Sequence, residues 1–552
     1  MSLHHPFAIW LLALSAFSAS AAIAGKDQDR QLHLATLASV RNSTGVIPPD
    51  PPVHPVTAMY NREAVIPPQC YTRTEGKYNP CYVCHQDSIH GRENVMDDRD
   101  LQVAYSFSDQ GMTNHWKNLF EDRSQRVDAI SDREILDWVR QDNYSALPER
   151  LRQAGFKGWI PDLAGLENKE KAFDELGFAR DGSQWVAFNY KPMPSTFWPT
   201  NGSTDDVMIR LPAVYRENVD GNYSRDIYLA NLSIVEASIK GLSSISTPPI
   251  DEQVIDADLN NDKRLTIVQK IDNVTAYVGA AANYYFEAGI FPQGTEFLHT
   301  VRYLGVNGER VGISRRMKEV RYMRKDYALP KFALAQGYRE EHWNKEMGRL
   351  PGYINRGQRG LDNEMGWVIQ GFIEDGEGRL RANTFEENMF CMGCHTSIGA
   401  TIDKTFSFAR KIDGARGWGY IDLTGMPDAP NRGESQGEIA TYFERVGSSE
   451  FRNNTEIQEK FFNADGTVNR AKIAAAEDVY QLIAPSPERA LQLNKAYKVI
   501  VEDQDFIFGR DATVTPPDNV YAEIDNQTTP TLPEEVTYDW DIRLDWPEEK
   551  EQ

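Results

Sequence analysis

The chain has 552 residues, a formal charge of −22 at pH 7, 41% hydrophobic residues and 11% aromatic residues. This length exceeds what one hydrophobic core supports and the composition excludes wholesale disorder, so several globular domains are expected. Nucleic acids and anionic membranes bind clustered Lys and Arg, and the acidic balance therefore argues against both as partners. An acidic surface favours solubility, and steering of a basic redox partner is the alternative.

The first 24 residues (1–24) predict a signal peptide. Residues 7–24 form a short apolar run, and Ala22-Ile23-Ala24 fits the A-x-A cleavage pattern before Gly25. No Lys or Arg precedes the run, so an uncleaved membrane anchor is the alternative. No other stretch approaches the ~18 apolar residues of a spanning helix, and the mean hydropathy is −0.54. We expect a secreted, periplasmic or extracellular protein without a stable membrane span after cleavage.

Cysteine placement is the sharpest signal, because four of the five cysteines lie in two C-x-x-C-H motifs. Two cysteines three apart lie on one side of a helical turn, where both sulfurs reach the vinyl groups of one porphyrin and the next His reaches its iron. Random placement gives on the order of 0.001 such motifs. A zinc site or a dithiol is the alternative. The motif residues are Cys81, Cys84, His85, Cys391, Cys394 and His395.

Helix-start signals precede both motifs. Asn79 is a good N-cap with Pro80 at the first helical position, and Thr384 with Glu387 forms a capping-box pattern. The sequence therefore predicts that each motif sits at the start of a helix.

On these motifs the chain resembles dihaem c-type cytochromes. The resemblance implies two covalently bound haems c, with His85 and His395 as proximal iron ligands. Around Met426-Pro427 the chain also resembles a small His/Met cytochrome c domain, which implies Met426 as the sixth ligand of the second haem. Met ligation would raise the potential of that haem and close its iron to substrates. Packing of Met426 in a core is the alternative.

The sixth ligand of the first haem has several candidates, namely His90, Met96, Met112 and His115. His90 follows the proximal ligand too closely to cross to the other haem face. His115 is followed by aromatic and apolar residues suited to a haem pocket, so we rank it first. Met112 ranks second, and an open iron ranks third.

Cys70 has no cysteine partner and allows three interpretations. A buried, inert thiol is the default, since free Cys is among the most buried residue types. A ligand to haem iron or to a second cofactor is the functional alternative, and an intermolecular disulfide is the third.

The order of composition along the chain predicts a mixed α+β, multidomain protein, with mainly helical cytochrome c-like haem domains flanking a β-rich insert. Helical periodicity marks residues 132–156, 437–446 and 486–503, and strand-like runs mark residues 206–215, 225–235, 275–286 and 295–306. The expected parts are an extended N-terminal segment (25–66), a first haem domain (67–183), a β-rich middle region (184–378), a second haem domain (379–510) and an acidic, Pro-rich tail (511–552) that is either extended or loosely packed.

Asp258, Asn260 and Asp262 match the first oxygen positions of a calcium-binding loop. Lys263 stands where such loops have Gly, and Gln269 stands where they have a bidentate Glu. A calcium site that braces the fold is one interpretation, and a solvated Asx-rich turn is the other.

Two function classes fit these observations. The first is a secreted dihaem protein that transfers electrons between redox partners, such as other cytochromes or quinone-linked reductases. The second is a dihaem oxidoreductase of the peroxidase-like type, with an open first haem acting on a small substrate. The size of the chain favours the enzyme. The long spacing between the motifs and the lack of an identifiable catalytic base count against it.

Overall fold

The computed structural model describes residues 65–74, 76–87, 98–194, 198–347, 353–396 and 398–548. The chain divides into two compact units, Met1–Pro55 and Val56–Gln552, and every described residue belongs to the second. The predicted signal peptide, most of the predicted N-terminal segment, His90 and Met96 lie outside the described residues.

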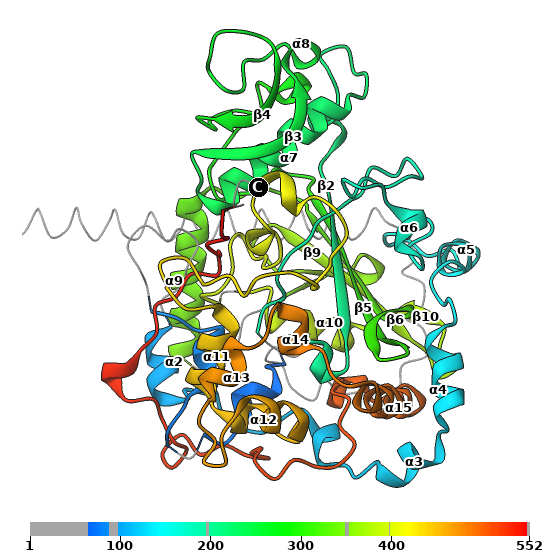
Figure 1. The fold of residues 1–552 in the computed structure, drawn as a ribbon, viewed down its shortest axis with the longest axis vertical. Coiled ribbons are helices and arrows are strands. Elements are labelled where there is room, and N and C mark those ends of the chain that lie inside the picture. The colour runs from blue at the N-terminus through cyan, green and yellow to red at the C-terminus, as the bar shows by residue number, and fades with distance from the viewer. Residues whose placement is uncertain are drawn as a thin grey trace, which may run out of the picture. The chain divides into compact units, whose positions relative to one another are not determined.

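The prediction of a mixed α+β fold is confirmed (Figure 1). The helices are α2 Arg99–Ala104, α3 Ser124–Ala129, α4 Asp132–Val139, α5 Leu147–Gln153, α6 Lys169–Ala172, α7 Arg225–Lys240, α8 Glu252–Ile255, α9 Lys331–Glu346, α10 Phe385–Met392, α11 Glu438–Val446, α12 Thr455–Phe461, α13 Arg470–Ala474, α14 Val479–Ile483 and α15 Pro487–Asp503. The strands are β1 Val186–Ala187, β2 Thr204–Arg210, β3 Ser244–Asp251, β4 Ile267–Asp272, β5 Glu296–Asn307, β6 Arg310–Lys325, β7 Ile354–Asn355, β8 Leu361–Asp362, β9 Trp367–Glu374 and β10 Leu380–Ala382.

An antiparallel sheet of eight strands organises the described part of the chain. Its order is β1-β2-β5-β6-β9-β8-β7, and β10 pairs with β9. Strands β3 and β4 form a separate pair, which lies beside α7 and α8 at the top of Figure 1. The long strands β5 and β6 form the centre, and α15 and α4 pack against them.

The two faces of the sheet carry separate cores, because side chains alternate along each strand. On one face, Met208, Leu298 and Phe372 pack with the chain between Tyr144 and Trp185. On the other face, a larger core contains the inward side chains of the same strands together with α7, α10 and α11. Both C-x-x-C-H segments pack against this second core. We call this side of the sheet the front face, and its core the front-face core.

Two of the four strand-like runs are strands, as predicted, and two are not. Residues 204–210 and 296–307 form β2 and β5, whereas residues 225–235 lie in helix α7. Nearly every residue of α7 is buried, so its apolar residues surround the helix and hide the helical period. Residues 275–286 form turns and one short 3-10 helix, η6 Gly279–Ala281.

The C-terminal segment is extended, the first of the two alternatives expected for it, and it is closely packed on the rest of the chain. Trp540 and Leu544 are buried in the front-face core, and the Trp540 indole N–H donates to the carbonyl of Tyr82 at 2.9 Å. Hydrophobic side chains within the acidic stretch therefore hold the end of the chain over the first motif.

Candidate functional site

The first motif lies on the short 3-10 helix η2, Pro80–Val83. The side chain of Asn79 accepts a hydrogen bond from the Cys81 backbone at 3.0 Å, and Pro80 occupies the first helical position, as predicted. Asn79 is fully buried and also donates to the carbonyl of Gln102. This cap fixes where Cys81 enters the helix.

The imidazole of His85 is oriented by a carboxylate. His85 Nδ1 lies 2.8 Å from Asp98 Oδ2, and both side chains are largely buried. An ionised carboxylate only accepts hydrogen bonds, so Nδ1 carries the proton and donates it. In the tautomer of the neutral ring that donates from Nδ1, Nε2 keeps its lone pair, which is the form in which His binds a metal.

The second motif lies at the end of helix α10 rather than at a helix start, which corrects the prediction for this motif. The predicted capping box of Thr384 and Glu387 is present, but it begins the helix several residues before Cys391. The helix ends at Met392, because the chain turns at Gly393. A Cβ at Gly393 would lie 2.2 Å from the carbonyl oxygen of Val65, so only Gly fits there.

The imidazole of His395 is oriented by a backbone carbonyl. Its Nδ1 lies 2.8 Å from the carbonyl oxygen of Lys404, and its own carbonyl accepts from the side chain of Asn363 at 2.9 Å. Burial lowers the pKa of His395 to about 4, so the ring is neutral at physiological pH. Nδ1 again donates, and Nε2 again keeps its lone pair.

Segments of both motifs lie close together although 310 positions separate them in the sequence. Phe390, next to Cys391, stacks edge-on against Trp116 at 5.3 Å and packs against the core that contains Cys70. Burial and then the nearby thiol of Cys394 raise the pKa of Cys84. The structure therefore gathers sulfur atoms from both motifs into one region.

Cys70 belongs to the same region. A hydrogen bond with Cys81 and then burial raise its pKa well above that of a free thiol. Burial likewise raises the pKa of Cys394 to about 11. These thiols are protonated at neutral pH, so Cys70 has the environment of an inert buried thiol rather than that of a reactive thiolate.

The donor set fits covalent haem better than a bare metal ion. Each motif offers two thiols and one imidazole whose Nδ1 is already hydrogen-bonded. Within the described ranges, no group of three or more His, Cys, Asp and Glu side chains is arranged to hold a metal ion. The residues thus match two thioether attachments with one proximal His each.

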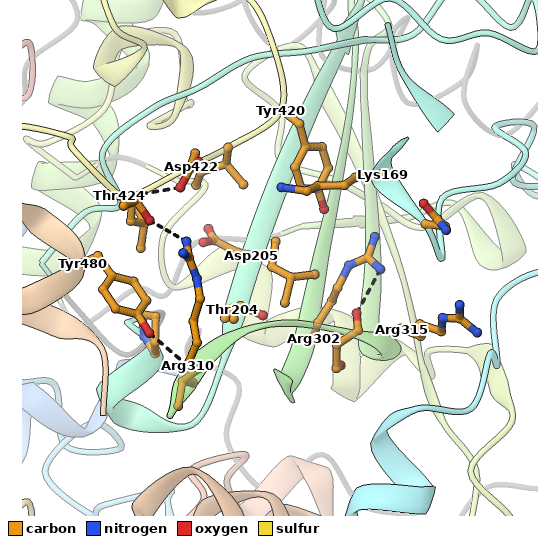
Figure 2. A pocket seen from close by; sticks show the side chains of 18 of the residues that line it. Lys169, Thr204, Asp205, Arg302, Arg310, Arg315, Tyr420, Asp422, Thr424 and Tyr480 are labelled. Atoms are coloured by element: carbon orange, nitrogen blue, oxygen red, sulfur yellow. Dashed lines mark hydrogen bonds between the residues drawn. The ribbon is translucent and has the colours of Figure 1, made fainter. Parts of the chain in front are cut away.

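A cavity of about 380 Å³ opens beside the ends of β2, β5 and β6. Figure 2 shows Arg310 and Tyr480 along one side and Tyr420 with Lys169 along the other. Asp205, at the inner wall, is buried and lies 3.4 Å from the Nε2 of His299. The cavity therefore extends to the carboxylate of Asp205, which lies beside His299 on the front face of the sheet.

Two predicted sixth ligands occupy defined places. Met426 is 2% exposed, and its backbone is hydrogen-bonded to Leu423 and to Val479 at the start of α14. His115 is buried, with its ring 6.3 Å from that of Phe390 beside the second motif. Burial lowers the pKa of His115 to about 4, which leaves a neutral ring. Both assignments stay predictions.

The predicted calcium-loop residues form an exposed turn before β4. Asp258 accepts hydrogen bonds from the backbone amides of Asp262 and Lys263, and Asn260 also accepts from Asp262. These bonds are those of an Asx-rich turn. Calcium binding stays a prediction.

Sequence reasoning missed Asp98, Lys404 and His299. Asp98 and Lys404 follow their motif histidines in the sequence by a short stretch of chain. No local sequence pattern distinguishes them from the other residues there. His299 lies in a predicted strand that also contains Thr300 and Arg302, so no local pattern singles it out.

Taken together, the fold and the site define an α+β protein that holds two C-x-x-C-H segments on one face of an antiparallel sheet. A family model described as “-like lipoprotein” matches residues 53–479. An uncharacterized lipoprotein of Aquifex aeolicus (strain VF5) is 33% identical over an alignment of 517 residues, and the match covers 82% of this chain and 86% of the relative. No solved structure matches. The chain belongs to this lipoprotein family.

This membership corrects the resemblance to dihaem c-type cytochromes, including the small His/Met domain and the weaker similarity to dihaem peroxidases. The match runs through both motifs and the whole sheet, and it leads to a lipoprotein family. Two five-residue motifs describe an attachment chemistry and cover little of the chain, so they do not determine the family.

Membership of a lipoprotein family also implies a location outside the cytoplasm, in agreement with the coarse prediction of a secreted protein. In the part of the chain that the structure describes, no helix is long and apolar enough to cross a membrane.

Proposed function

We propose that this lipoprotein binds two haems c covalently and transfers electrons between redox partner proteins outside the cytoplasm. The cysteines of each C-x-x-C-H segment would form the two thioethers, and His85 and His395 would be the proximal iron ligands. Bound haem would supply a one-electron redox couple at each segment. Periplasmic or extracellular partners of this kind would include other cytochromes and quinone-linked reductases.

The observation that carries the proposal is that both motif histidines are hydrogen-bonded through Nδ1 to a buried acceptor. Each ring donates through Nδ1 to a fixed acceptor, Asp98 Oδ2 or the Lys404 carbonyl, at 2.8 Å. Such an acceptor fixes the tautomer and the direction of Nε2, as in metal-bound histidines generally. Neither a disulfide nor a structural role would require this arrangement at both motifs.

The spatial arrangement supports transfer between the two groups. The thiols of Cys84 and Cys394 are within electrostatic reach of each other, and aromatic rings pack between the segments. Two haems attached here would be neighbours, so an electron that enters one could pass to the other. In this proposal the helical segments 67–183 and 379–510 hold the haems, and the middle region 184–378 supplies the sheet between them.

The proposal is tested by the mass and the absorbance spectrum of the protein purified from a host that attaches haem c. We expect the mass of two haems and a reduced spectrum typical of haem c. The double variants Cys81→Ala/Cys84→Ala and Cys391→Ala/Cys394→Ala should each lose one haem.

Cys70→Ser is the matched control, because it removes a buried cysteine of the same region outside the motifs. It should keep both haems. A wild-type protein without covalent haem would contradict the proposed function, and so would a double variant that still carries two.

A further inference from the structure

The front face of the sheet, against which the second motif packs, also carries a histidine. His299 on β5 lies opposite Arg321 on β6, and Arg321 lies opposite Gly371 on β9. Residues directly opposite each other in an antiparallel sheet point to the same face, so these three positions form one row.

This row faces helix α10. The backbone N–H of Gly371 donates to Asn388 of α10 at 3.0 Å, and a Cβ at Gly371 would lie 3.2 Å from the same side-chain oxygen. The side chains of His299 and Arg321 therefore lie on the same face of the sheet as the helix whose last turn contains Cys391.

The chain after the motif returns to the same face. Lys325 is on the same side of β6 as Arg321 and forms a fully buried ion pair with Asp403. Asp403 precedes Lys404, whose carbonyl holds the ring of His395. His395 is thus fixed over the same face of the sheet that carries Arg321 and His299.

His299 is itself held in place. Its Nε2 lies 3.4 Å from Asp205 Oδ2, and that carboxylate also accepts a hydrogen bond from the hydroxyl of Tyr190. The His299 side chain is 22% exposed and Asp205 is buried. A carboxylate beside an imidazole is a common support for a metal-binding histidine.

We propose that His299 is the sixth iron ligand of the haem attached at Cys391 and Cys394. The inference rests on the proposed function and names a different residue from Met426. Two imidazoles would then bind this iron, closing it to substrates and giving it a lower potential than His/Met ligation would.

The test is electron paramagnetic resonance and redox titration of the ferric holoprotein. In His299→Ala, we expect the signal of one haem to change from low-spin to high-spin, with two haems still present by mass. The affected signal should be the one missing from Cys391→Ala/Cys394→Ala. His299→Met, which keeps a possible ligand and much of the volume, should restore a low-spin haem with a raised potential.

His342→Ala and Met426→Ala are the controls, and both should keep the wild-type spectrum. His342, on α9, is a half-buried histidine outside both motifs. The inference would be overturned if His299→Ala and His299→Met both kept the wild-type spectrum and potentials, or if Met426→Ala produced the high-spin haem instead. A wild-type protein without haem would overturn the proposed function together with this inference, whereas either preceding result leaves the proposed function intact.

Discussion

The two C-x-x-C-H segments share a sequence pattern but differ in how the protein holds the histidine. At the first segment a short 3-10 helix carries the cysteines, and the charged carboxylate of Asp98 accepts from His85. At the second, the cysteines end a capped α-helix on the sheet, and the neutral carbonyl of Lys404 accepts from His395.

In the proposed function, this difference would make the two haem sites unequal although their attachment motifs are the same. A carboxylate makes the imidazole a stronger donor to iron than a backbone carbonyl does, and stronger donation favours ferric iron. With similar sixth ligands, the first haem would have the lower potential. The second site depends instead on buried charges that hold its loop to the sheet.

The largest effect should come from breaking the support of the second site. Asp403→Ala leaves the fully buried Lys325 without its ion-pair partner and frees the loop that carries Lys404. Loss of one member of a buried pair costs about 3–5 kcal/mol. Urea unfolding should show this loss. The control Asp137→Ala, in an exposed pair with Arg133, should change stability by less than about 1 kcal/mol, and an equal loss there would contradict the argument.

The free energy of unfolding should depend on pH through Glu450, a buried carboxyl near the first segment. Burial raises the pKa of Glu450 from 4.5 to about 7, and this carboxyl accepts from Tyr442 and raises the pKa of Cys70. Because the folded pKa is the higher one, the stability that Glu450 contributes below pH ~4.5 is lost as the pH rises toward ~7. Glu450→Gln should remove this loss, which amounts to up to about 3 kcal/mol.

Unfolding free energies at pH 5 and pH 8 measure this effect as the difference between variant and wild type. His115 and His395 titrate in both proteins, so their contributions cancel in that difference. Glu488→Gln, at an exposed position of α15, should retain the wild-type pH dependence. A Glu450→Gln variant that also retains it would show that Glu450 ionises normally.

The smallest expected effect is on the reduction potential of the first haem. It tests most directly whether the two histidine supports differ in strength. Asp98→Asn keeps the shape of the His85 partner but removes its charge, so the potential of one haem should rise while the other stays unchanged. Outer-shell changes of this kind alter metal binding about 10- to 100-fold. For a one-electron couple this corresponds to about 60–120 mV. A spectroelectrochemical titration that shows both potentials moving equally, or neither, would contradict the proposed inequality of the sites.

The fold was predictable where apolar residues recur at regular spacing and therefore lie on one side of a helix or strand. Helices α4, α11 and α15 have an apolar stripe, and β2 and β5 have a run of β-branched and aromatic residues between turns. Helix α7 was missed because it is buried on all sides, although Ser224 and Gly241 are good signals for its two ends.

The candidate site was predictable in part. The six motif residues follow from local spacing, since attachment chemistry requires that spacing. The row of His299, Arg321 and Gly371 depends on the register of three strands, and the meeting of the two motifs depends on contacts between distant segments. Such contacts leave no periodic trace in one sequence, so neither could be derived from it.

The packing of Trp540 onto Tyr82 has a consequence for assembly. These residues are 458 positions apart, so the segment that covers the first motif is made long after the motif itself. The contact between Trp540 and Tyr82 can therefore form only after nearly the whole chain has been made. The C-terminal segment thus covers the first motif later than the segments that are its neighbours in the sequence.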